Sequence, residues 1–334
     1  MGDPTLTVIW AAIIAIGIAA YVVMDGFDLG IGMLFPRLKP GPERDMAMNS
    51  IAPVWDGNET WLVLGGGGLL AAFPLAYAVI LPALYAPLIA MLLGLVFRGV
   101  AFEFRWRDPA HRKYWDLAFF GGSLVATLAQ GITLGALLEG IEVEGRAYAG
   151  GWWDWLTPFS LLCGAALAIA YQLLGSCWLV MKTTGSLQTE ARRIAKILVP
   201  FTLLMIGAVS LATPYVEDQY FSRWFEWPGL VVTIPMPLLI LGVTYMIWRD
   251  LESGYDYRPF FWALGLFLLS MVGLAISIWP DVVPGRISIY EAAAPRESQI
   301  FMLVGAGVLI PVIFAYTAWA YWIFRGKVDE AGYH

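Results

Sequence analysis

Long runs of apolar residues, separated by short polar stretches, repeat along the whole chain. Most runs have about 20 residues, the length at which an α-helix crosses roughly 30 Å of hydrocarbon. The pattern predicts an all-α polytopic membrane protein with nine spans in a single integral membrane domain, 1–334. The expected limits are 5–35, 51–73, 76–101, 116–138, 157–181, 195–214, 229–248, 259–279 and 299–324. The first run is overlong, so we expect its end to tilt, break or leave the membrane.

The composition agrees with this class and excludes others. Hydrophobic residues make up 59% of the chain, against about 45–50% in a typical soluble domain. Charged residues contribute only 14%, and the net charge of −6 gives no support for nucleic-acid binding. Residues 186–196 form a short amphipathic extension before the sixth span.

Lys and Arg are divided unequally between the two sets of loops. Of the 20 basic residues, 16 fall on the side that holds the first loop and the C-terminus. The other four are Arg146, Arg223, Arg286 and Arg296. Because cytoplasmic loops carry the excess of Lys and Arg, we expect the N-terminus outside and the C-terminus in the cytoplasm.

Acidic residues lie inside two of the expected spans, where a carboxylate is costly and usually has a partner and a task. Asp25 and Asp28 are near the end of the first span, while Asp56 and Glu59 are in the first turns of the second. Since the two spans run in opposite directions, these acids should lie at similar depth, on the side where Arg98 ends the third span.

Two interpretations of these acids stay open from the residues alone. In one, Asp25, Asp56 and Arg98 form a buried charge cluster that fixes three helices together, while Asp28 and Glu59 point at lipid headgroups. In the other, the acids line a hydrated path for protons or ions that enter from the cytoplasm. A dry Asp–Arg pair would relay protons poorly, because the arginine keeps the carboxylate ionised.

The chain has only two histidines and two cysteines, which limits the metal and thiol chemistry that it can carry out. The two histidines, His111 and His334, lie outside the spans, so haem ligation by histidine within this chain is not expected. Cys163 and Cys177 are 14 residues apart on one helix, about 21 Å at 1.5 Å per residue, which is too far for a mutual disulfide. No zinc or iron–sulfur spacing occurs.

Small and amide residues inside the spans favour helix packing over ligand binding. Gly26 and Gly30 form a small-xxx-small pair, and the glycines at 65–68 allow close helix contact or a local break. Gln130 and Gln172 are isolated membrane amides, which favour interhelical hydrogen bonds.

Three segments carry a resemblance to a known family: MDGFDLGIGM at 24–33, NSIAPVWDGN at 49–58 and FRGVAFE at 97–103. In order, spacing and number of spans the chain resembles subunit II of the cytochrome bd-type quinol oxidases over essentially its whole length. The WDGN element at the start of a span is the most specific part. The modest length and compact loops resemble the cyanide-insensitive branch of the family.

The resemblance implies a haem-free subunit with two four-helix bundles plus one peripheral helix, located in the bacterial cytoplasmic (inner) membrane. It implies a partner, subunit I, that holds two haem b and one haem d, oxidises quinol and reduces dioxygen to water with cytoplasmic protons. Lipids, quinone and a small single-span accessory subunit are further partners that it suggests. By position, Asp56 resembles the family's proton-path aspartate, Asp25 an acid on the entrance side, and Arg98 the neighbouring arginine. Glu59 departs from the family's pattern, in which glutamine is expected.

An alternative of another class is a proton- or cation-coupled transporter that works without a redox partner. Both classes use acids within the membrane, so Asp25, Asp56 and Glu59 do not distinguish them. A third interpretation is an assembly subunit whose buried charges only fix helix packing.

Overall fold

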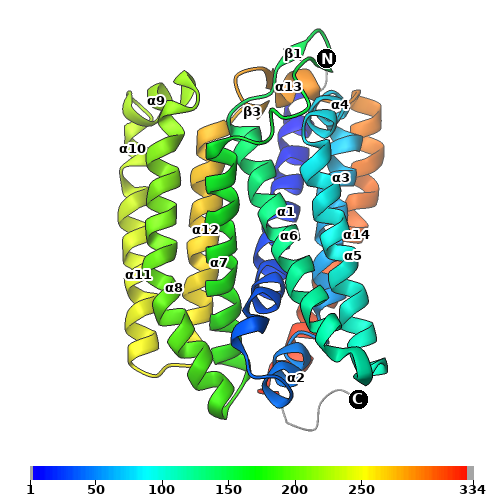
Figure 1. The fold of residues 1–334 in the computed structure, drawn as a ribbon. Coiled ribbons are helices and arrows are strands. Elements are labelled where there is room, and N and C mark those ends of the chain that lie inside the picture. Colours follow the sequence, from blue (N-terminus) through cyan, green and yellow to red (C-terminus); the bar gives the residue numbers. More distant parts are fainter. Residues whose placement is uncertain (1–2, 329–334) are drawn as a thin grey trace.

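The structure is a computed structural model, and it describes residues 3–328. It is a bundle of long helices with short elements at both ends (Figure 1). The helices are α1 (Pro4–Leu34), α2 (Pro42–Asn49), α3 (Trp55–Ala72), α4 (Pro74–Ala83), α5 (Tyr85–Arg107), α6 (Arg112–Leu138), α7 (Pro158–Lys182), α8 (Gly185–Ala212), α9 (Asp218–Phe225), α10 (Leu230–Thr233), α11 (Pro235–Glu252), α12 (Arg258–Ile278), α13 (Ile289–Ala292) and α14 (Arg296–Ile323). The strands are β1 (Val143–Glu144), β2 (Ala147–Tyr148), β3 (Asp281–Val283) and β4 (Ile287–Ser288).

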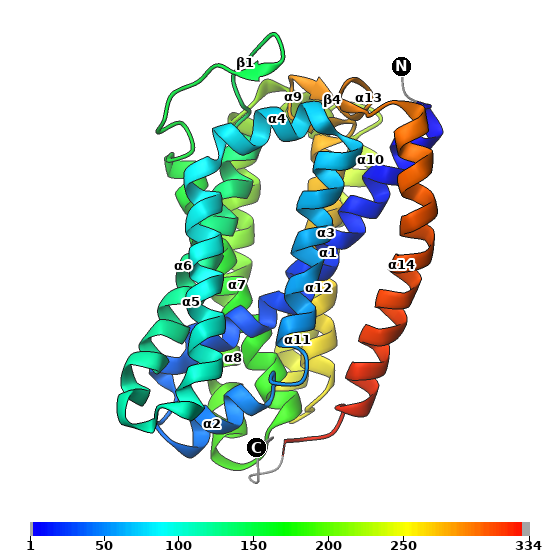
Figure 2. The same ribbon diagram turned by 90° about the vertical axis from the view of Figure 1, so that its right-hand side faces the viewer.

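Eight helical stretches among the described residues are long and apolar enough to cross a membrane. The expected second span is not one of them: it forms α3, whose 18 residues include Asp56 and Glu59. Figure 2 nevertheless shows α3 running from the end of the bundle that carries α2 to the end that carries α4. The all-α polytopic fold is confirmed.

The expected third span, 76–101, is wrong in its limits. The structure divides this region at Leu84 into α4, which lies across one end of the bundle, and α5, which runs its length (Figure 2). Pro87 explains the division, because it lacks the N–H that a continuous helix would need at that position. In the first turn of a helix the backbone N–H groups have no acceptor within the helix, so proline is tolerated there.

The overlong first run forms one unbroken helix. The 31 residues of α1 are about 46 Å long at 1.5 Å per residue, and Figure 2 shows the helix crossing the bundle obliquely. The expected break is therefore not observed, and the whole helix is inclined to its neighbours. Likewise, the amphipathic extension at 186–196 is continuous with the sixth span as α8.

The long helices lie in two adjoining groups, with one outlying helix (Figure 1). The first group holds α1, α3, α5 and α6, and the second holds α7, α8, α11 and α12. The groups join where α1 and α6 pack on α7. α14 packs mainly on the edge formed by α1 and α3, with a further ring contact between Tyr321 and Trp178 on α7, and its most apolar window has no buried residue. This is the arrangement expected for two four-helix bundles plus one peripheral helix.

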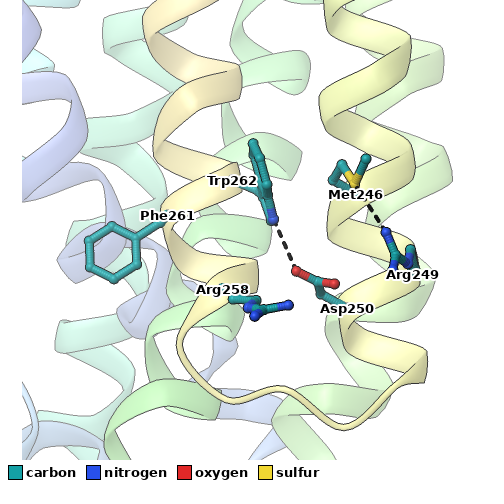
Figure 3. A pocket seen from close by; sticks show the side chains of 6 residues that line it. All are labelled: Met246, Arg249, Asp250, Arg258, Phe261 and Trp262. Atoms are coloured by element: carbon teal, nitrogen blue, oxygen red, sulfur yellow. Dashed lines mark hydrogen bonds between the residues drawn. The ribbon is translucent and has the colours of Figure 1, made fainter.

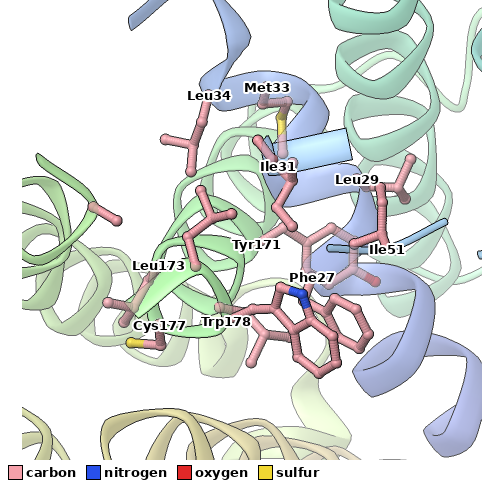
Figure 4. Close-up of a cluster of buried hydrophobic side chains, with 14 of the residues drawn as sticks. Phe27, Leu29, Ile31, Met33, Leu34, Ile51, Tyr171, Leu173, Cys177 and Trp178 are labelled. Carbon is pink, nitrogen blue, oxygen red and sulfur yellow. The ribbon is translucent and has the colours of Figure 1, made fainter. Parts of the chain in front are cut away.

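The main apolar core lies around the second half of α1, where it meets α7 and α12. The rings of Phe27 and Trp178 stack with centroids 4.1 Å apart, and Phe260 packs edge-on against Trp178 at 5.1 Å. Figure 4 shows Phe27 and Trp178 with Tyr171 and Cys177, and the last two are fully buried. Cys163 and Cys177 are free, as their spacing predicted.

Glycines allow α1 to approach α7 closely, as the Gly26–Gly30 pair predicted. A Cβ atom on Gly30 would lie 1.9 Å from the backbone oxygen of Tyr171, and one on Gly175 would lie 2.7 Å from the backbone nitrogen of Ile31. In α3, Gly65 and Gly68 face α1, while Gly66 and Gly67 have nothing within 4 Å. The run of four glycines therefore allows contact on one face and does not break the helix.

We expect Gly30→Ala to destabilise the assembled protein by about 1–3 kcal/mol or more, because overpacking against a backbone atom cannot be relieved by a rotamer change. The control is Gly66→Ala, which adds the same methyl group in a region with no neighbour within 4 Å. Thermal unfolding midpoints of the two variants test this. Equal midpoints would show that α1 and α7 can separate without cost.

An ion-pair network that the sequence did not predict fixes α2 to α5 and α6. The fully buried Arg105 donates to Asp116 at 2.5 Å and to Asp45 at 2.8 Å. Asp116 also accepts from Arg44 at 2.7 Å. Ion pairs of opposite charge therefore hold α2, α5 and α6 together at this end of the bundle. The hairpins β1–β2 and β3–β4 lie at the opposite end, together with α9 and α13 (Figure 1).

Candidate functional site

One arginine joins the acids of the first two long helices. Arg98 on α5 donates from Nη1 to Asp25 Oδ1 at 2.8 Å and to Glu59 Oε1 at 2.5 Å. Its Nη2 lies 3.7 Å from Asp28 Oδ2. Arg98 is 1% exposed and both aspartates are fully buried, whereas the Glu59 side chain is 26% exposed. The predicted similar depth of the acids is confirmed by these contacts.

Local sequence explains how these groups meet. Asp25 and Asp28 are three residues apart on α1, so both point to the same face of the helix. Arg98 reaches them because α5 packs closely on α6 through Gly94 and Gly122. A Cβ on Gly122 would lie 2.5 Å from the backbone oxygen of Gly94 and 2.8 Å from the backbone nitrogen of Arg98.

Asn58 connects this cluster to the peripheral helix. Its Nδ2 donates to Asp28 Oδ2 at 2.8 Å and to the backbone oxygen of Met24 at 3.3 Å. Tyr321 on α14 donates its hydroxyl to Asn58 Oδ1 at 2.9 Å. Sequence reasoning missed Asn58 and Tyr321 and placed Asp28 at the headgroups, although the spacing from Asp25 was a signal for Asp28.

A second polar group lies one helical turn from Asp25, at Tyr21. Gln130 on α6 donates to the Tyr21 hydroxyl at 2.6 Å and accepts from the Tyr171 hydroxyl at 3.1 Å. Gln172 on α7 accepts from Arg37 at 2.7 Å. The predicted interhelical hydrogen bonds are therefore confirmed for Gln130, and they extend the polar groups along α1, whereas Gln172 bonds to a residue just after the end of α1.

Asp56 is not part of the buried cluster. It lies on the exposed surface of α3, and the arginine cluster holds Asp28 and Glu59 in its place. The reason is the phase of the helix: Asn58, two residues later, points into the cluster, and two residues turn a helix by about 200°. The interpretation that placed Asp56 in the buried charge cluster, with Asp28 and Glu59 at the lipid headgroups, is therefore wrong.

A family model described as "Cytochrome bd terminal oxidase subunit II" matches residues 6–324. The chain belongs to this family. Subunit 2 of the cytochrome bd-I ubiquinol oxidase of Escherichia coli (strain K12) is 29% identical, over 97% of this chain and 96% of that protein. Subunit 2 of the cytochrome bd ubiquinol oxidase of Bacillus subtilis (strain 168) is also 29% identical, over 96% of each chain.

Solved structures show the same fold. A chain of the bd oxidase from Geobacillus thermodenitrificans aligns with a TM-score of 0.79 at 17% identity, over 96% of this chain and 99% of that one. As a member of this family, the chain is a membrane subunit of an oxidoreductase complex, and the transporter alternative is not favoured. Membership implies a complex with subunit I.

The family implies haem in the complex, so we asked whether side chains of this chain could ligate the haem iron. The described residues contain no cluster of three His, Cys, Asp or Glu side chains that could hold a metal ion. Within residues 3–328 the one histidine is His111, which is 63% exposed in the turn between α5 and α6 and pairs with Asp108 at 3.0 Å. His334 lies outside the described residues. The side chains of the bundle interior therefore do not fit axial haem ligation by histidine.

Proposed function

We propose that this chain is the haem-free subunit II that supplies a cytoplasmic proton path to the oxidase and stabilises the haem-bearing subunit I. Reduction of dioxygen to water consumes protons at a centre surrounded by hydrocarbon, which excludes bulk water. Acidic side chains and bound water must therefore relay those protons. The quinol and the haem groups belong to the partner in this proposal.

The observation that carries the proposal is the graded exposure of the acids. Asp56 is on the surface, Glu59 three residues later is 26% exposed, and Asp25 behind it is fully buried. Arg98 touches both Glu59 and Asp25. In our proposal a proton passes from Asp56 to Glu59 and then to the Asp25–Asp28 group.

Charge balance supports a role beyond packing. Among the described residues, Asp25, Asp28 and Glu59 share one guanidinium, that of Arg98. Three ionised carboxylates would leave an excess of negative charge in a buried site, which is costly. In addition, Asp25 Oδ2 and Asp28 Oδ1 have no hydrogen-bond partner within residues 3–328. A group of acids with more carboxyl groups than cations is suited to hold and release protons.

The haem assignment has its own test. We expect the gently purified complex to show haem absorbance, and we expect this chain to keep no stoichiometric haem after the larger partner is removed. Absorbance spectra, together with identification of the chains that co-purify, measure both. Haem that stays with the separated chain would refute the assignment.

The orientation also has a test. The four basic residues of the smaller group lie at the β1–β2 turn, in α9, at the β3–β4 turn and at the start of α14, all at one end of the bundle (Figure 1). We propose that this end faces outward. A cytoplasmic reporter fused after His334 should be active, and a periplasm-only reporter should be silent. Activity of the periplasmic reporter would contradict the orientation.

A further inference from the structure

A pocket outside the acid cluster lies between the ends of α11 and α12, on the edge of the bundle away from α14. Its volume is about 330 Å³. Figure 3 shows its lining residues, Met246, Arg249 and Asp250 from α11 and Arg258, Phe261 and Trp262 from α12. Phe261 is 62% exposed and, with Met246, gives the pocket an apolar edge at the surface of the two helices, although the Phe261 ring projects from the side of α12 opposite to Asp250 (Figure 3).

The pocket holds a buried acid without an ion-pair partner. Asp250 is 3% exposed, and its Oδ2 accepts a hydrogen bond from Trp262 Nε1 at 3.0 Å. Within the described chain no Lys, Arg or His nitrogen lies within 4.0 Å of it, although Arg249 and Arg258 line the same pocket. Arg249 instead extends along Met246, and Arg258 lies over the ring of Tyr255 with 4.0 Å to the centroid.

The two helix ends give the pocket opposite electrostatic sides. Asp250 is in the last turn of α11, which ends at Glu252, where the helix dipole is negative and a cation is favoured. Arg258 is the first residue of α12, where the dipole is positive and an anion is favoured. A ligand that matches both sides carries a cation and an anion a few bonds apart.

We infer that this pocket binds the headgroup of a phosphatidylethanolamine lipid. The phosphate meets Arg249, Arg258 and the start of α12, and the ammonium donates to the carboxylate of Asp250. The acyl chains lie against Met246 and Phe261, which face the membrane. A lipid is the source of the headgroup because the charged groups and this apolar exit belong to one pocket. The inference does not depend on the proton path.

The test uses the complex purified with its partner chains. The complex is depleted of lipid and then reloaded from vesicles with equal amounts of phosphatidylethanolamine, phosphatidylglycerol and phosphatidylcholine that carry identical acyl chains. Native mass spectrometry counts the retained lipids, and a photoreactive phosphatidylethanolamine reports where it binds. We expect crosslinks in residues 246–262 and preferential retention of phosphatidylethanolamine.

Variants separate the two halves of the site. Asp250→Asn keeps an acceptor for Trp262 but loses the charge, so the preference for phosphatidylethanolamine over phosphatidylglycerol should fall about tenfold. Arg258→Gln and the exposed Arg249→Gln should lower the retention of both lipids. Matched controls at the same end of the bundle are Glu103→Gln and Arg107→Gln on α5, which are 54% and 74% exposed and lie outside the pocket. Both should retain the wild-type lipid ratio.

Several results would overturn the inference. Phosphatidylglycerol retained ahead of phosphatidylethanolamine would make the site purely anion-binding, and equal retention of phosphatidylcholine would remove the role of the ammonium N–H groups. Displacement of the lipid by soluble phosphoethanolamine at equal concentration would show that the acyl chains do not contribute. An unchanged lipid ratio in a folded, haem-containing Asp250→Asn complex would exclude Asp250.

Discussion

Replacement of Glu59 by Gln is expected to lower oxygen reduction per assembled complex by about a hundredfold, the lower end of what a positioned proton-transferring group contributes. Gln keeps the size of the side chain and can still accept a hydrogen bond from Arg98, but it cannot carry a proton onward. Quinol oxidation should then slow while electrons accumulate on the haem of the complex. The measurement is turnover per haem, recorded beside the yield of complex.

Two comparisons make the Glu59 result specific. Glu59→Asp retains a titrating group and should recover part of the rate. Asp56→Asn should slow turnover if the surface acid feeds Glu59, and Asp56→Glu should recover part of that loss. Full turnover of Glu59→Gln with a reduced yield would leave Glu59 as a structural partner of Arg98 and remove it from the mechanism.

The sequence predicted the helical membrane fold because apolar runs of about 20 residues have few other stable structures. It did not predict the division at Leu84, since α4 and α5 are both apolar and the run through them is continuous. The prolines at 82 and 87 were the local signal. Hydropathy also cannot show that α4 lies across one end of the bundle, because an apolar helix at that end has the same composition as one that crosses it.

The depth of the acids could be predicted, but their direction could not. Asp25, Glu59 and Arg98 meet because consecutive antiparallel helices bring the end of one beside the start of the next. Which acid points inward depends on the rotation of α3 about its axis, and an error of one residue changes that direction by about 100°. The contact of Tyr321 with Asn58 joins segments 263 residues apart and leaves no local pattern in the sequence.

Replacement of Arg98 by Gln is expected to destabilise the complex by about 3–5 kcal/mol, the usual cost of leaving one member of a buried charge group without its partner. Asp25 and Asp28 are fully buried on α1, and Arg98 is their one ion-pair partner among the described residues. A lower thermal midpoint and a lower yield of haem-containing complex are the measurements. Arg107→Gln, which removes a 74% exposed arginine from the same helix, should change the midpoint little.

A double variant shows whether the charge or the shape of Arg98 matters. Asp25→Asn combined with Arg98→Gln removes one acid with the cation, so it should recover part of the stability that Arg98→Gln loses. Arg98→Lys keeps the charge but not the planar guanidinium that touches three carboxyl groups. Its thermal midpoint should therefore lie between those of the wild type and Arg98→Gln. A wild-type midpoint for Arg98→Gln alone would mean that the three acids are already neutral in the folded protein. In that case the cluster would be a store of protons, and Arg98 would not be needed to keep it buried.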